Sequence, residues 1–83
     1  MSIDADKFDK HRNTFKYILE FLKNNRDRAF TVEYIAKQIG VGVYEVKNAL
    51  MWESLAWVID RTYRSLIESA TVEGIVYYKY KSE

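Results

Sequence analysis

The chain contains no cysteine and a single histidine, and this lack of cross-linking chemistry constrains its fold more than any other feature. Disulfides and zinc sites hold many small domains together, and the sequence supplies neither. With 83 residues the chain is long enough for one domain, spanning 1–83, whose core is thin. We therefore expect it to be stabilised by side-chain packing alone or by association with a partner.

The first predicted element is a helix over residues 6–24. Its apolar residues recur at helical spacing and mark one stripe, made of Phe8, Phe15, Ile18, Leu19 and Leu22. Asp4 or Asp6 can cap the start of this helix. Tyr17 and Phe21 lie four residues apart on a second face. Two interpretations of this pair are open: packing beneath a later strand, which we favour, or a seam between two copies of the chain.

Two further helices are predicted, at 32–39 and 44–57. Thr31 is a good N-cap for the first of them, and Gly40 suits the left-handed conformation that often follows a helix. The residues of the first that would face inward are Val32, Ile35, Ala36 and Ile39. The buried face of the second would comprise Val46, Ala49, Leu50 and Leu55, with Val43 just before them.

Residues 58–63 and 75–81 are rich in β-branched and aromatic residues, and we expect each to form a strand. Gly74 marks the turn before the second strand. We expect residues 64–73 to form a loop or wing, although the apolar residues there also recur at helical spacing. The predicted order is three helices followed by a β-hairpin, which is an α+β fold that is mainly α.

The stretch Ile35-Ala36-Lys37-Gln38-Ile39-Gly40-Val41 resembles a helix-turn-helix pattern, in which a small Ala packs where two helices cross and Gly makes the turn. With the hairpin, the chain is similar to winged helix-turn-helix DNA-binding domains over roughly residues 10–81. Its composition is also similar to that of short winged-helix regulators of archaea and their viruses. The resemblance implies a small transcriptional regulator that binds double-stranded DNA. Its helix 44–57 would enter the major groove, and its wing would touch the backbone.

The resemblance implies DNA contacts on three parts of the chain. Around the third helix it implies Gly42, Tyr44, Lys47 and Asn48. Asn48 could pair bidentately with adenine, Lys47 could contact guanine or phosphate, and Tyr44 and the backbone N–H of Gly42 could each contact phosphate. Phosphate contacts flanking the second helix would come from Arg26, Arg28 and Thr31. From the wing, Arg61 and Arg64 would contact the DNA backbone.

The distribution of charge favours a second interpretation. The net charge is +1, yet the third helix carries Glu45, Lys47 and Glu53, a net charge of −1. Affinity for DNA depends largely on neutralising phosphates, so an acidic reading helix opposes that role. The basic residues gather instead around the first helix, at Lys10, His11, Arg12, Lys16, Lys23, Arg26 and Arg28. The alternative is a winged-helix protein-interaction module of a replication or transcription assembly, which binds its partner through an apolar aromatic surface.

Large apolar residues exceed what one thin core needs. They are Trp52, Trp57, Tyr17, Phe21, Tyr63, Leu66 and Ile67. We expect a homodimer that reads a two-fold site, because a second chain would cover this surplus. The alternative is that both tryptophans wedge between the third helix and the sheet of a monomer.

Other classes of function are not expected. An enzyme would need a nucleophile with its base, and the sequence has no cysteine and no Ser/His/Asp set. Gly40 and Gly42 match no nucleotide fingerprint, and His11 has no partner at ligand spacing, so we expect no cofactor and no metal. No apolar run approaches the roughly 18–20 residues of a membrane span, and the acidic N-terminus does not resemble a signal peptide. We expect an intracellular, cytoplasmic protein, associated with the nucleoid if it binds DNA.

Overall fold

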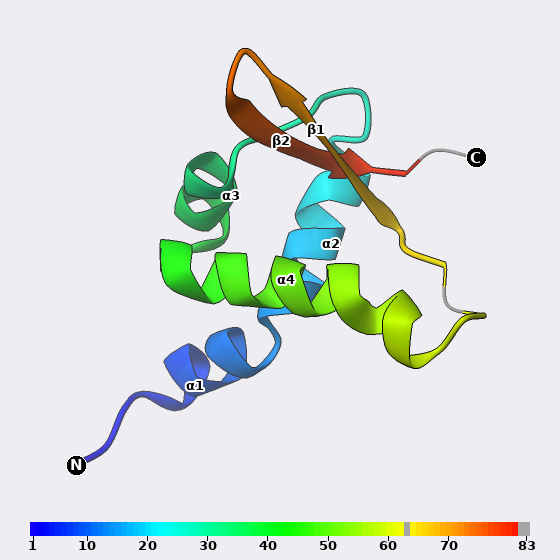
Figure 1. Cartoon of the computed structure of the whole chain (residues 1–83). Coiled ribbons are helices and arrows are strands. Elements are labelled where there is room, and N and C mark those ends of the chain that lie inside the picture. Colours follow the sequence, from blue (N-terminus) through cyan, green and yellow to red (C-terminus); the bar gives the residue numbers. More distant parts are fainter. Residues whose placement is uncertain (63, 82–83) are drawn as a thin grey trace.

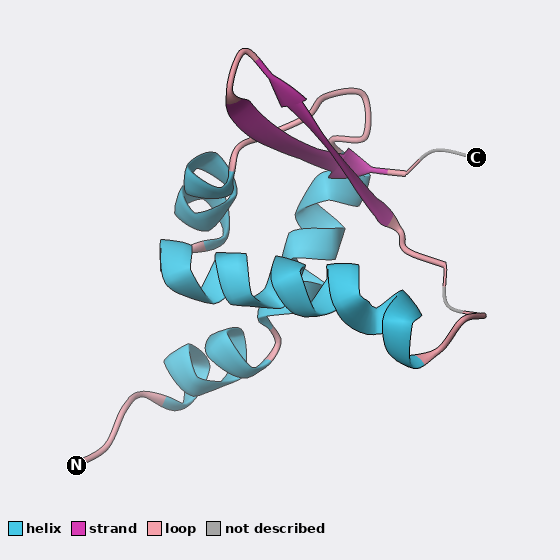
Figure 2. Ribbon diagram, viewed as in Figure 1, coloured by secondary structure: helices cyan, strands magenta, loops and turns pink. Residues whose placement is uncertain are grey.

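The computed structural model describes residues 1–62 and 64–81, with only the backbone of Trp57. Within these residues the chain forms α1 (Ala5–Arg12), α2 (Thr14–Asn24), α3 (Val32–Ile39) and α4 (Val43–Ile59), and then β1 (Ile67–Val72) and β2 (Ile75–Tyr80). Figure 1 shows α4 crossing α2, with the hairpin on one side of α4 and α1 on the other. Figure 2 shows the balance of helix and strand. The fold is α+β and mainly α, as predicted.

The prediction of one helix over 6–24 was wrong, because the helix breaks at Asn13. The backbone there leaves the helical region, with φ −105° and ψ 26°. Asn13 Nδ2 donates to the Asp9 carbonyl (2.9 Å), and Thr14 Oγ1 donates to the His11 carbonyl (2.7 Å). The Asp9 carbonyl still accepts the Asn13 backbone N–H, whereas the Thr14 hydroxyl takes the His11 carbonyl at the point where the first helix ends. As a result, α1 and α2 are separate segments.

The prediction for α3 is confirmed at both ends. Thr31 Oγ1 accepts a hydrogen bond from the Tyr34 N–H at 3.2 Å, which satisfies one of the free donors of the first turn. Gly40 takes the left-handed conformation with φ 72°, and its N–H donates to the Ala36 carbonyl. The turn that joins α3 to α4 therefore depends on a residue without a β-carbon.

The two left-handed glycines give a matched test of this turn. Gly40→Ala is expected to lower the free energy of unfolding by about 1–2 kcal/mol, because an L side chain is strained at this φ. A β-carbon there would also lie 3.2 Å from Lys10 Nζ. Gly74→Ala also places an L side chain at a strained positive φ, here 81°, but its β-carbon meets no described atom within 4 Å. We expect it to lower the free energy of unfolding by about 1 kcal/mol. Urea unfolding measures both changes, and an unchanged stability of Gly40→Ala would contradict the role of the turn.

The predicted strand 58–63 was wrong, and the helix predicted over 44–57 is longer at both ends. Val58 and Ile59 continue α4, which ends where the Asp60 carboxylate accepts hydrogen bonds from the Thr62 N–H (3.0 Å) and hydroxyl (2.7 Å). Residues 60–62 are exposed and offer no apolar face, whereas Ile67 is buried in the core. The first strand therefore begins at Ile67, inside the segment expected to be loop or wing. Tyr63 lies outside the described residues.

The second strand and its turn are confirmed within one residue. Glu73 (φ 53°) and Gly74 (φ 81°) both have positive φ and close a two-residue hairpin between the paired residues Val72 and Ile75. The hairpin is also tied to the α2–α3 connection. Phe30 and Tyr78 exchange two backbone hydrogen bonds of 2.8 Å, which form an isolated antiparallel bridge. Strand β2 therefore pairs with β1 and also with the connection between α2 and α3.

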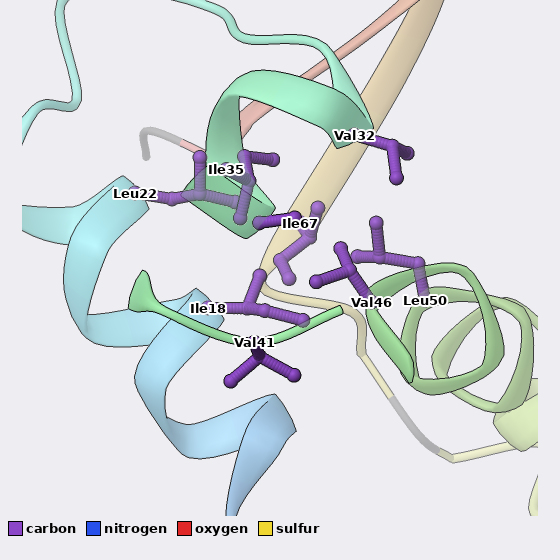
Figure 3. Close-up of a cluster of buried hydrophobic side chains, with 9 residues drawn as sticks. Ile18, Leu22, Val32, Ile35, Val41, Val46, Leu50 and Ile67 are labelled. Atoms are coloured by element: carbon purple, nitrogen blue, oxygen red, sulfur yellow. The ribbon is translucent and has the colours of Figure 1, made fainter. Parts of the chain in front are cut away.

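The core lies where α2, α3, α4 and the start of β1 converge. Its buried apolar residues are Ile18, Leu22, Val32, Ile35, Ala36, Val41, Val46, Leu50 and Ile67. Figure 3 shows most of these side chains pointing toward one another between the elements. The inward face predicted for α3 is confirmed, with Ile39 only partly buried. Ile18, Leu22, Val46 and Leu50 were also predicted correctly.

Several residues predicted to be buried are exposed. Phe8 is 53% exposed. It lies on α1, all of whose eight residues are described and none of which is buried. Val43 and Leu55 on α4 are also exposed, at 39% and 44%. Trp52 is 65% exposed, so it does not wedge between α4 and the hairpin. The position of the Trp57 side chain lies outside what the structure describes.

Candidate nucleic-acid interface

The first half of α4 presents the polar residues predicted to read DNA. Tyr44 and Lys47 are exposed and Asn48 is half-buried, whereas Val46 between them is fully buried. Residues three and four apart share a helix face, so the three polar side chains lie together opposite the core. Gly42 is the N-cap of this helix and has extended backbone. These four residues therefore form one continuous surface.

Both acidic residues of α4 have partners outside the set Tyr44, Lys47 and Asn48, but the Glu45 carboxylate lies at the Gly42 end of this surface. The Glu45 carboxylate lies beside Gly42, where its Oε2 would collide with an added β-carbon, and its Oε1 is 3.5 Å from His11 Nδ1. Glu53 Oε1 accepts a 2.6 Å hydrogen bond from Ser65 Oγ, on the side of α4 that faces the start of β1. Glu45, Lys47 and Glu53 together give α4 a net charge of −1. The surface formed by Tyr44, Lys47 and Asn48 carries only the positive charge of Lys47.

Two basic residues of α1 lie at the turn that precedes α4, which we did not predict. Lys10 Nζ approaches Gly40, and His11 contacts Glu45. The break at Asn13 allows this placement, because α1 leaves the axis of α2 (Figure 1). The basic run around Lys10 was visible in the sequence, but a continuous helix over 6–24 would have carried it away from the turn. Positive charge from α1 therefore joins the first half of α4.

Arg28 and Thr31 line a hollow of about 550 Å³ at the start of α3, together with Asn25, Tyr34 and Tyr77. Arg28 is exposed, and its backbone N–H donates to the Asn25 carbonyl. The Thr31 hydroxyl accepts from Tyr34 N–H and, as a hydroxyl, can also donate. The structure thus brings together two of the three residues predicted to contact phosphate beside α3.

Arg26, the third of these residues, is engaged within the protein. Its guanidinium lies over the Tyr80 ring, 5.4 Å from the centroid, and its Nε donates to the Lys23 carbonyl at 3.2 Å. A cation over an aromatic face contributes about 0.5–1 kcal/mol at exposed sites. Arg26 therefore joins the end of α2 to β2 instead of extending toward the hollow that contains Arg28.

Arg61 and Arg64 do not lie on the hairpin, where the prediction placed them. Both are exposed in the connection between α4 and β1. The turn around Arg61 is held by Asp60, whose carboxyl pKa is lowered by hydrogen bonds from the Thr62 hydroxyl and N–H. The tip of the hairpin instead carries Glu73 and Gly74. An acidic tip is unsuited to a phosphate backbone, so the predicted wing contact has no support from the position of these arginines.

An open groove of about 670 Å³ separates α4 from the hairpin. Its lining includes Lys47, Met51 and Ser54 from α4 and Ser69 and Gly74 from the hairpin. Glu33 of α3 also reaches it. The groove therefore begins at the polar surface of α4 and carries both signs of charge.

The second half of α4 is apolar on its exposed side. The residues Met51, Trp52, Leu55, Val58 and Ile59, which we call the apolar patch, are each at least 44% exposed. Between Met51 and Ile59 the only charged residue is Glu53, which faces Ser65. Contiguous exposed apolar surface of this kind marks an interaction site. The outer side of α4 thus changes from polar to apolar along its length.

Comparison of the chain with protein-family models, with curated proteins and with solved structures finds no match. Among the described residues, no His, Asp and Glu side chains gather in a group of three or more suited to a metal ion. None of the helices traced over residues 1–62 and 64–81 is both long and apolar enough to span a membrane.

Proposed function

We propose that this protein is a small winged helix-turn-helix regulator that binds double-stranded DNA through the first half of α4. The order of its helices and hairpin is compatible with that family. The Phe30–Tyr78 bridge ties the α2–α3 connection to the hairpin, as a third short strand would. Such a role would place the protein in the cytoplasm, associated with the nucleoid, and it includes no catalytic step.

The observation that carries the proposal is the position of the two carboxylates of α4. The acidic character of this helix was the main objection to a reading role. Glu45 is directed toward His11 and Gly42, and Glu53 toward Ser65, so both carboxylates lie beside the set Tyr44, Lys47 and Asn48 and not within it. That surface offers one cation and two hydrogen-bonding side chains to a DNA groove, which is the chemistry that base and phosphate contacts need.

Lys10 and Arg28 add backbone contacts on either side of this surface. Lys10 lies at the turn before α4, and Arg28 lies beside Thr31 at the start of α3. With Lys47, three cations per copy would neutralise phosphates, so for each bound copy the logarithm of affinity should fall with the logarithm of salt concentration with a slope of about −3. This predicts a loss of on the order of fiftyfold between 50 and 200 mM salt.

Fluorescence anisotropy with a labelled duplex tests the proposal. Arg28→Ala is expected to weaken binding to all duplexes alike and to reduce the salt slope by about 1. Asn48→Ala should relax sequence preference, with a loss of about 1–3 kcal/mol on the preferred site alone. The control is Lys79→Ala, which removes a cation that is 3.3 Å from Glu68 on the hairpin and should leave binding unchanged. If no duplex from a random pool is retained at low salt, the proposal is wrong.

The apolar patch favours one other function, a protein-interaction module. Such a module would bind its partner through Trp52 and its neighbours, with no dependence on phosphate. Its binding would be almost insensitive to salt, and Arg28→Ala would not alter it. The salt titration therefore separates the two functions.

A further inference from the structure

We propose that the apolar patch of α4 is a dimer interface, and that its occupant is α4 of a second copy of this chain. The two helices would run antiparallel about a two-fold axis near Leu55. The interface itself follows from spacing, area and charge on α4. The antiparallel direction rests on the proposed DNA-binding function.

The outer side of α4 has the spacing of a helix-pairing seam. Met51, Leu55 and Val58, which lie in the region of overlap, are separated by four and three residues, and Tyr44 and Asn48 continue this spacing beyond it. This alternation is the 3.5-residue repeat that lets two helices pack along a common line. Each of the four apolar or aromatic members is exposed, which places the seam opposite the buried Val46 and Leu50. A seam of this kind fits another helix more closely than an irregular surface.

The accessible surface of the chain is larger than its mass requires. It amounts to 6435 Å² for 9.9 kDa, whereas a compact monomer of that mass exposes about 5,200 Å². Part of the excess belongs to α1. Complete covering of the apolar patch would remove on the order of 600 Å² per copy, close to the roughly 800 Å² per partner of a standard interface. The patch is therefore large enough to form most of a stable dimer interface.

A second copy suits this patch better than a different partner. The patch carries no charge of its own, and the chain has a net charge of only +1, so two copies meet without strong repulsion. A two-fold axis places the same surface on both sides, and Trp52 then lies against the patch of the partner as a large anchor. Asn48, the one polar residue within the seam, lies toward its first half, outside the region of overlap.

Antiparallel pairing keeps the two polar surfaces apart and accessible. At 1.5 Å rise per residue, the segments from Tyr44 to Asn48 of the two copies would lie about 30 Å apart when Leu55 is at the axis. Both segments therefore lie beyond the contact between the two copies, which leaves each of them able to bind DNA.

Sedimentation velocity without DNA tests the interface, with two valines as a matched pair. Val58 in the patch is 50% exposed and Val72 near the hairpin tip is 54% exposed. Wild-type protein is expected to be a dimer at micromolar concentration. Val58→Lys should weaken dimerisation at least a hundredfold, because two charges would be brought into the apolar contact, whereas Val72→Lys should have no effect. A folded wild-type chain that stays monomeric up to submillimolar concentration overturns the proposal.

Disulfide cross-linking locates the contact even if a lysine variant does not fold. Because the chain has no cysteine, Leu55→Cys introduces the only thiol, and mild oxidation should join two copies through it. Val72→Cys should remain monomeric under the same conditions. Cross-linking through Val72→Cys alone would place the interface elsewhere and overturn the proposal. A dimer that binds no duplex would support this interface while disproving the DNA-binding function.

Discussion

Ile35→Ala is expected to lower the free energy of unfolding by about 3–4 kcal/mol, the largest effect of any single alanine substitution considered. Ile35 is fully buried and lies on α3 between α2 and α4 (Figure 3). The substitution removes its apolar area and leaves a cavity that the surrounding helices fill only in part. For a domain of this length the total stability is roughly 4–12 kcal/mol, so the loss is a large fraction of it.

The control for Ile35→Ala is Ile75→Ala on the hairpin. Ile75 is 49% exposed and begins β2, so its truncation should reduce stability by about 1 kcal/mol or less. Urea unfolding followed by circular dichroism at one fixed protein concentration gives both values, because any dimerisation makes stability depend on concentration. Similar losses for the two isoleucines would contradict the position of the core.

Phe21→Ala is expected to lower the free energy of unfolding by about 2–3 kcal/mol. The centroid of the Phe21 ring lies 4.9 Å from that of Phe30 and 6.3 Å from that of Tyr34. The rings of Phe30 and Tyr34 stack with their centroids 5.3 Å apart. This cluster joins α2 to α3 and to the connection that pairs with β2. Loss of the Phe21 ring therefore removes two contacts, one to Phe30 and one to Tyr34.

Phe8→Ala provides the matched comparison, since Phe8 also lies on a helix but is 53% exposed. Its truncation should change stability by less than about 0.5 kcal/mol. Near-UV circular dichroism should show loss of the aromatic signal for Phe21→Ala alone. If Phe8→Ala proves as destabilising as Phe21→Ala, then α1 packs more firmly than its exposure indicates. The sequence left two interpretations of Phe21 open, packing beneath a later strand or a seam between two copies. The structure places its ring against Phe30 and Tyr34 of the same chain, and a large loss of stability for Phe21→Ala would support this packing.

The parts of the fold set by local chemistry could be predicted from the sequence. Thr31 and Gly40 bound α3 as expected, because a cap and a left-handed glycine act within one turn. The break at Asn13 was missed because periodicity of Phe8 and Phe15 continues across it. The strand predicted at 58–63 was wrong because β-branched residues have only a weak preference for strands, and Val58 and Ile59 continue α4 instead.

The candidate interface was predictable in its residues but not in its electrostatics. Tyr44, Lys47 and Asn48 follow from the helix-turn-helix pattern, and the structure places them on one surface. The directions of Glu45 and Glu53 could not be predicted, because each depends on a partner distant in the sequence, His11 and Ser65. Arg26 was assigned to DNA on the resemblance alone. Its position over the Tyr80 ring could not be predicted, because Tyr80 is distant in the sequence.

The bridge between Phe30 and Tyr78 has a consequence for the order of folding. Helices α2, α3 and α4 are formed by contacts between neighbours in the sequence, which close quickly during synthesis. The partner of Phe30 lies in β2, far along the chain, and the loop between the two residues must close before their hydrogen bonds can form. A ribosome-bound chain can therefore assemble its helices first, but the connection before α3 acquires its backbone partner only after Tyr78 has been synthesised.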